Sequence, residues 1–180
     1  MTVTTLDPTF SGTAAGPQVG QLAPRPKSLD GLTVAMVMNR LADCELMFDA
    51  LYEELRRRDD LAGVIKVNKD SQSVPPTPEQ WAEIEKADVA ITGFGGCGSC
   101  STRSMRDALD LEAKGIPAVS IVHTALVPAV RVIAEIVGKP DYEIVTVDYP
   151  HNPVATWPKE EAQEIARDIA DAVRQRLVAA

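Results

Sequence analysis

The sequence predicts a three-layer α/β domain with a roughly five-stranded parallel sheet, of the flavodoxin-like or Rossmann-like kind. From Leu32 onward, short apolar segments rich in Val and Ile alternate with amphipathic helical segments. Such alternation favours parallel strands with helices covering both faces of the sheet. The chain has 180 residues, 45% of them hydrophobic and 24% charged, which suits one domain with a core of its own.

Five segments carry the strand pattern. Each is short, apolar and rich in Val and Ile, as is typical of strands that are buried on both faces. The predicted strands cover residues 33–38, 63–67, 88–92, 118–122 and 143–147.

The segments between these strands carry helical patterns. Leu41, Cys44, Phe48, Leu51 and Leu55 recur three or four positions apart and form one apolar stripe on a helix. A similar stripe over 162–177 predicts the last helix. Further helices are expected over 79–86, 101–114 and 127–137, the last of them stopped by Gly138 and Pro140.

Residues 1–30 differ in composition from the rest of the chain. They are rich in Thr, Gly, Pro and Ser, and four prolines make them a poor helix or strand. We expect a flexible leader or a partner-binding arm here, through which the chain forms a homo- or hetero-oligomer. Residues 31–180 are expected to form a single α/β domain.

The overall charge excludes several function classes. The net charge is −8 and the isoelectric point is near 4.8, whereas nucleic-acid binding needs clustered Lys and Arg. No apolar run is long enough to cross a membrane, and the N-terminus lacks the pattern of a secretory signal. We therefore expect a cytoplasmic protein without nucleic-acid or membrane partners, in which a cysteine pair is catalytic or metal-binding.

The most informative motif is a cysteine pair on a glycine-rich turn. Residues 93–100 read GFGGCGSC, which places Cys97 and Cys100 in a CxxC arrangement between a predicted strand and a predicted helix. A thiolate at a helix N-terminus is stabilised by unpaired N–H groups and by the helix dipole. The glycines indicate a sharp bend that something approaches closely. Thiol chemistry is the first hypothesis.

Other interpretations of this loop have weaker support. Gly93, Gly95 and Gly98 satisfy the dinucleotide-binding pattern, but the loop does not open the first βα unit and the next strand lacks the acidic residue expected at its end. Binding of a small anion or carboxylate on the same amides is favoured over a dinucleotide. A zinc site would need four ligands, and Cys44 falls on a buried helical stripe. A pair of buried small residues in a tight turn is the remaining alternative.

Polar residues follow every predicted strand. In a parallel sheet these carboxyl ends lie at one edge, where ligands bind near the topological switch point. Both histidines of the chain fall on this edge, where each is a candidate proton donor or a structural residue. The residues in question are Asn39 and Arg40, Asn68 and Lys69, Cys97 and Cys100, His123 and Thr124, and His151 and Asn152.

The motif Cys97-Gly98-Ser99-Cys100, followed by Ser101-Thr102, resembles the signature of the UGSC-type family. Proteins of this family are related to the selenoprotein subunits of glycine, sarcosine, betaine and D-proline reductases, and some carry selenocysteine at the first motif position. The resemblance covers roughly residues 26–177. Weaker matches lie at residues 29–31, 39, 114–117 and 150–153.

The resemblance implies a redox-active or nucleophilic sulfur at Cys97, with Cys100 as its resolving partner. We expect Cys97 to attack a small electrophilic substrate, including carboxylate-bearing ones, and Cys100 to leave a disulfide that an external thiol reductant resets. No other cofactor and no metal are expected. Arg103 or Arg106 would help the helix to stabilise the thiolate. His123 and His151 are the candidate proton donors.

We expect the remaining site residues to orient the substrate: Asn39, Gly95, Gly96, Gly98, Ser99, Ser101, Thr102 and Arg103. Two other functions stay open. In a non-redox hydratase or lyase, Cys97 would form an adduct that a histidine-activated water resolves. Alternatively, the chain is a non-catalytic subunit of a heteromeric enzyme, held to its partner by the N-terminal arm.

Overall fold

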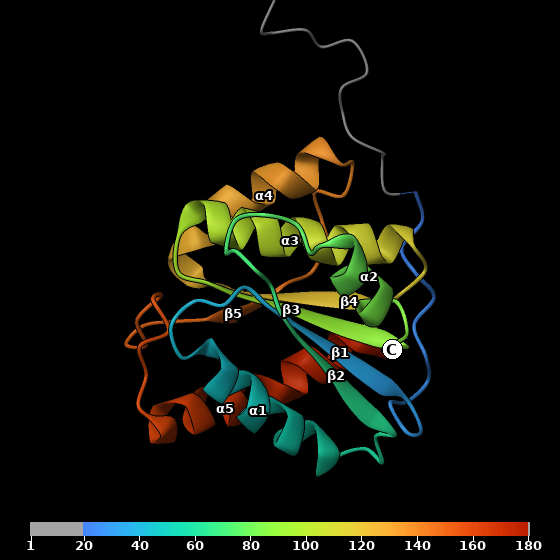
Figure 1. The fold of residues 1–180 in the computed structure, drawn as a ribbon, viewed down its shortest axis with the longest axis horizontal. Coiled ribbons are helices and arrows are strands. Elements are labelled where there is room, and N and C mark those ends of the chain that lie inside the picture. The colour runs from blue at the N-terminus through green and yellow to red at the C-terminus, as the bar shows by residue number, and fades with distance from the viewer. Residues whose placement is uncertain (1–19, 180) are drawn as a thin grey trace, which may run out of the picture.

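A computed structural model gives the structure of the chain and describes residues 20–179. Within this part, a five-stranded parallel sheet lies between two layers of helices (Figure 1), which confirms the predicted fold class. The sheet has the order β2-β1-β3-β4-β5, which is the flavodoxin-like one. Its strands are β1 (Thr33–Met38), β2 (Gly63–Asn68), β3 (Val89–Gly95), β4 (Ala118–His123) and β5 (Val145–Val147).

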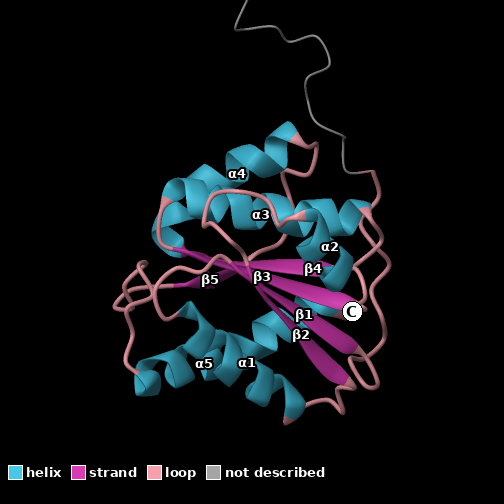
Figure 2. Cartoon of the chain, viewed as in Figure 1, coloured by secondary structure: helices cyan, strands magenta, loops and turns pink. Residues whose placement is uncertain are grey.

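The helices divide between the two faces of the sheet (Figure 2). On one face α1 (Cys44–Arg56) packs against α5 (Lys159–Leu177). The other face carries α2 (Pro78–Ile84), α3 (Gly98–Ala113) and α4 (Val127–Ile136), the last preceded by a short 3-10 turn, Thr124–Leu126.

Successive side chains of β1 point to opposite faces of the sheet and contribute to two separate hydrophobic cores. Met36 and Met38 belong to the core under α1 and α5, whereas Ala35 and Val37 belong to the core under α3 and α4. Both rows are buried, which explains why the strands read as continuous apolar runs. Asn39 is the next residue of the row that faces α3.

Two element boundaries differ from the prediction in ways that shape the site. Helix α3 begins at Gly98, three residues before the predicted start, because the Cys97 side chain caps its first turn. Strand β3 extends to Gly95 rather than ending at Thr92. The cysteine pair therefore lies at the junction of a strand end and a helix start, which only Gly96 and Cys97 separate.

Part of the predicted leader packs against the domain. Leu29 is fully buried, and Arg25 forms an ion pair with the buried Glu112 of α3. The packed unit therefore begins before residue 31. Residues 1–19 of the expected leader lie outside the described residues. Over residues 20–179, no helix has both the length and the apolar character that a membrane span requires.

Candidate active site

The carboxyl ends of β1 and β3 lie side by side at the switch point of the sheet. Met38 pairs with Gly93, and the backbone N–H of Asn39 donates to the Gly93 carbonyl oxygen at 2.8 Å. Strand β1 has β2 as its neighbour on one side and β3 on the other, so the direction in which strands are added reverses between β1 and β3. In doubly wound sheets ligands bind in the crevice outside this point.

The turn after β3 is pressed against two other loops, and this explains one of its glycines. A Cβ atom on Gly96 would lie 2.3 Å from Cδ2 of Leu41 and 2.6 Å from the Pro153 carbonyl oxygen. Only glycine fits at such a close approach. The loops after β1, β3 and β5 therefore meet directly beside Cys97.

Cys97 is exposed and lies at the N-cap of α3. Its Sγ accepts a hydrogen bond from the Cys100 backbone N–H at 3.2 Å. This is the position at which the dipole and the unpaired N–H groups of a 16-residue helix favour negative charge. The structure thus places Cys97 where the sequence predicts it.

Cys97 and Cys100 form a disulfide, and the two sulfurs have opposite surroundings. The Cα atoms are 5.3 Å apart, and Cys100 is only 1% exposed. A molecule from solvent can reach Cys97 but not Cys100. In thiol–disulfide chemistry this asymmetry separates an attacking sulfur from a resolving one.

Three polar side chains surround the two sulfurs. Ser99 Oγ lies 3.3 Å from the Cys97 Sγ. On the other side, Ser73 Oγ and Gln72 Oε1 lie 3.8 and 3.6 Å from the Cys100 Sγ. Ser73 and Gln72 come from residues 69–77, which connect β2 to α2, and the sequence analysis did not include them.

This connection is fixed to α3 by Lys69. Its ammonium group is buried, donates to the Val74 carbonyl oxygen at 3.0 Å, and forms an ion pair with Asp107 of α3. At the far end, Thr77 and Gln80 form a capping box that starts α2. The segment that carries Gln72 and Ser73 is therefore held at both ends.

Comparison with known protein families matches residues 4–179 to the UGSC family. The chain belongs to the UGSC family. A comparison with curated proteins gave no match. The CGSC turn that carries the resemblance at the sequence level is also where the structure joins Cys97 to Cys100 at the start of α3.

Two of the predicted residues of this UGSC protein, the histidines, are engaged elsewhere. His123 is fully buried, its Nδ1 accepts from the Ala125 amide at 3.1 Å, and its Nε2 donates to the His151 carbonyl at 2.9 Å. Since Nδ1 accepts a backbone proton, Nε2 carries the ring proton. His151 Nδ1 lies 2.8 Å from the Glu161 carboxylate of α5. Neither ring makes a hydrogen bond to a described sulfur.

The structure also directs the two arginines away from Cys97. Arg103 Nε donates to Asp107 at 2.8 Å, and its Nη2 donates to Asp110. Arg106 Nε donates to Asp110 at 2.7 Å. Both guanidinium groups thus lie toward the C-terminal half of α3. The expected stabilisation of a Cys97 thiolate by arginine is therefore not found. The N-terminus of α3 remains as the group that favours negative charge on this sulfur.

Asn39 has the arrangement expected of a ligand-binding residue. It is fully buried, and its Oδ1 accepts from the Leu41 amide at 3.2 Å. Its Nδ2 has no hydrogen-bond partner among the described residues. A buried donor without a partner is costly, so this side chain is, among the predicted site residues that the structure describes, the one with an unused polar atom in a fully buried position.

The other predicted binding residues line the first turn of α3. Gly98 begins the helix, Ser101 is buried within it, and Thr102 Oγ1 donates to the Ser99 carbonyl oxygen at 3.0 Å. Gly95 ends β3. The hydroxyl of Thr102 is therefore used within the helix, which leaves Ser99 as the hydroxyl nearest to Cys97.

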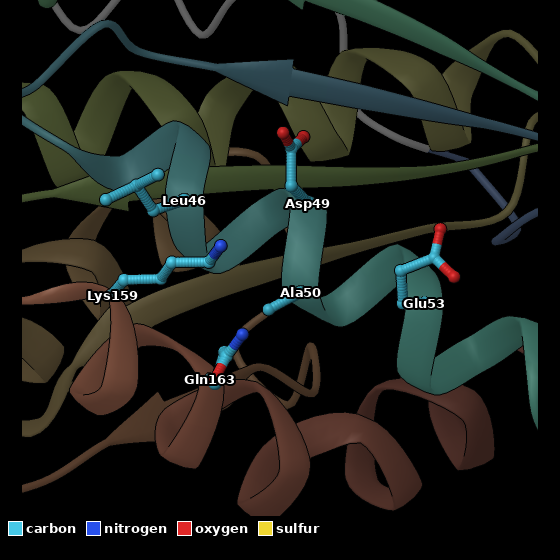
Figure 3. A pocket seen from close by; sticks show the side chains of 6 residues that line it. All are labelled: Leu46, Asp49, Ala50, Glu53, Lys159 and Gln163. Atoms are coloured by element: carbon cyan, nitrogen blue, oxygen red, sulfur yellow. The ribbon is translucent and has the colours of Figure 1, made fainter.

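The hollow of Figure 3 lies away from the cysteine pair. Within residues 20–179, no group of three or more His, Cys, Asp or Glu side chains is arranged to hold a metal ion. A hollow of about 350 Å³ lies between α1 and α5, on the sheet face opposite α3 (Figure 3). Its lining contains no sulfur and consists of Leu46, Asp49, Ala50, Glu53, Lys159 and Gln163.

Proposed function

We propose that this chain is a thiol-dependent reductase of small electrophilic molecules, in which Cys97 is the nucleophile and Cys100 the resolving thiol. The observation that carries the proposal is the contrast between the exposed Cys97 sulfur at the start of α3 and the buried Cys100 sulfur bonded to it. The motif resembles the signature of the UGSC family, and the expected relation of that family to reductase selenoprotein subunits favours the same chemistry.

In the first step the Cys97 thiolate attacks a carbon that carries a leaving group next to a carbonyl or carboxylate. A carbon–sulfur bond forms and the leaving group departs with its electron pair. The N-terminus of α3 stabilises the attacking thiolate. The buried and unpartnered Nδ2 of Asn39 would bind a carbonyl or carboxylate oxygen of a substrate that displaces the groups covering it.

In the second step the Cys100 thiolate attacks the Cys97 sulfur. A disulfide forms, the carbon–sulfur bond breaks, and the released carbanion, stabilised by its carbonyl, takes one proton. The two thiols thereby lose two electrons, and the substrate carbon gains them. An external dithiol then reduces the disulfide by exchange, which suits a reducing compartment such as the cytoplasm.

A non-redox hydratase or lyase would use Cys97 but would have no need for Cys100. The two functions are separated by an α-halo ketone as the probe for the reduced protein. The reductase predicts a stable Cys97 adduct in Cys100→Ser and a disulfide with released ketone in the wild type. Mass spectrometry reads both outcomes, and Cys44→Ser serves as the control.

Two results would overturn the proposal. A wild-type protein that keeps the adduct would exclude the resolving step and favour the non-redox function. A Cys97→Ser protein that still releases the ketone at the wild-type rate would exclude Cys97 as the nucleophile.

A further inference from the structure

Besides the disulfide bond, a chain of two hydroxyl groups links the sulfurs of Cys97 and Cys100. Cys97 Sγ lies 3.3 Å from Ser99 Oγ, which lies 3.1 Å from Ser73 Oγ, which in turn lies 3.8 Å from Cys100 Sγ. Each hydroxyl can donate one hydrogen bond and accept others. The line therefore runs from a buried sulfur, along two side chains, to an exposed one.

This line coincides with a chemical need of the proposed reaction. A resolving thiol must lose its proton before it can attack, and Cys100 is only 1% exposed. Its side-chain neighbours include Gln72 Oε1, at 3.6 Å from the Cys100 Sγ. Once the disulfide is reduced, this oxygen can accept a hydrogen bond from the thiol and hold the proton on sulfur. Ser73 is the neighbour that can donate to the thiolate as it forms.

We propose that Ser73 and Ser99 form a proton relay that removes the proton of Cys100 during the resolving step; this rests on the function proposed above. Cys100 gives its proton to Ser73, Ser73 gives its own to Ser99, and Ser99 gives its own to the carbanion leaving Cys97. Both hydroxyls end the step unchanged. No further oxidant or base is needed, since the proton released by Cys100 is consumed by the carbanion that leaves Cys97.

The fixed position of the β2–α2 connection makes the relay possible. Lys69 binds the carbonyl of Val74, the residue directly after Ser73. Ser99 belongs to the first turn of α3, which the Cys97 side chain caps. Both hydroxyls are thus held by ordered backbone, which a relay needs because proton transfer requires hydrogen-bond distances.

The test uses a dithiobis(nitrobenzoate) as the probe, because each of its two steps releases a coloured thiolate. In the first phase Cys97 of the reduced protein attacks the probe and becomes a mixed disulfide. In the second phase Cys100 attacks Cys97, the second coloured thiolate leaves, and the proton passes through Ser73 and Ser99 to water. Stopped-flow absorbance measures both rates.

The decisive comparison is Ser73→Val against Ser73→Thr, which differ in a hydroxyl but hardly in shape. Positioned proton transfer contributes roughly 100-fold or more, and water can replace part of it, so we expect Val to slow the second phase at least about tenfold. Thr should stay within about twofold of the wild type. Ser71→Val, in the same exposed loop, is the control that should change neither phase.

The results of these variants either support or refute the proton relay. An unchanged second phase in Ser73→Val overturns it, and so does an equal loss in Val and Thr, which would assign the effect to shape. Absence of the first phase in the wild type would instead refute Cys97 as the nucleophile, so failure of the relay and failure of the proposed function give different results.

Discussion

Lys69 and Asp107 form an ion pair that is almost completely removed from water. The Lys69 Nζ lies 2.7 Å from the Asp107 Oδ2, and the two side chains are 1% and 0% exposed. Burial lowers the pKa of Lys69 and raises the pKa of Asp107, since both charges lose their hydration. Arg103 shares the same carboxylate at 2.7 Å. The pair joins the β2–α2 connection to α3 beneath the cysteines.

Removing one member of this pair should be costly. In Lys69→Met a buried carboxylate keeps only Arg103 as its cation, and breaking such pairs costs about 3–5 kcal/mol. Lys66→Met is the matched control, because the Lys66–Asp49 pair is half exposed and should cost less than about 1 kcal/mol. Urea unfolding measures both. Equal, small losses would show that the buried pair does not hold the connection.

The two glycines that flank Cys97 should respond differently to alanine. A Cβ on Gly96 would meet the Pro153 carbonyl oxygen and the Val154 Cα at 2.6 and 2.9 Å, and this backbone cannot give way easily. We expect Gly96→Ala to destabilise the fold by about 1–3 kcal/mol, as overpacked sites do. Gly98→Ala has open space around its Cβ and should be tolerated. Thermal unfolding of both variants checks this, and equal behaviour would refute the close approach.

The buried thiol of Cys44 should make the protein less stable at alkaline pH. Burial raises the pKa of its thiol from 9.0 to about 11. The unfolded chain releases this proton first, so the stabilisation is fully present below pH 9.0 and is lost as the pH rises through about 11. A difference of that size corresponds to about 3 kcal/mol. The free energy of unfolding, measured from pH 8 to 11 with the disulfide intact, should fall more steeply with pH in the wild type than in Cys44→Ala. Parallel pH dependences in the two proteins would contradict this.

His123 should behave as a structural residue. His123→Leu removes the partner of the Ala125 amide and of the His151 carbonyl, and the two part-buried hydrogen bonds together contribute about 1–3 kcal/mol. The variant should therefore unfold more easily, while the alkylation rate of Cys97 at low temperature stays within about twofold. A slower alkylation with unchanged stability would return His123 to a chemical role at the cysteine pair.

Strands β1 and β4 could be predicted because they are mostly apolar and buried on both faces. Residues 33–38 and 118–122 contain one polar residue each, Thr33 and Ser120, and the structure places a strand over each range. The position of Cys97 also followed from the sequence, since a strand, a glycine-rich turn and a helix leave few places for it. Strand order had to come from the structure, because β3 could pair with either neighbour.

The side chains of the site were harder to predict. The sequence places His123 and Cys97 at one edge of the sheet, but side chains alternate between faces, and His123 follows the row of Val119 and Ile121 toward α5. Ser73 lies in a connection without periodicity, so no pattern could place it beside Cys100. Arg103 and Asp107 are four residues apart on α3, a spacing that favours their ion pair over the expected role of Arg103 at Cys97.

The most direct measurement is the alkylation of the reduced protein by iodoacetamide across a range of pH, with each cysteine followed by mass spectrometry. We expect Cys97 to react first, at neutral pH about tenfold faster than a free cysteine, with a rate that is already levelling off. Cys44 and Cys100, both 1% exposed, should react far more slowly. A Cys97 that reacts no faster than a free cysteine, or later than Cys100, would exclude it as the activated nucleophile.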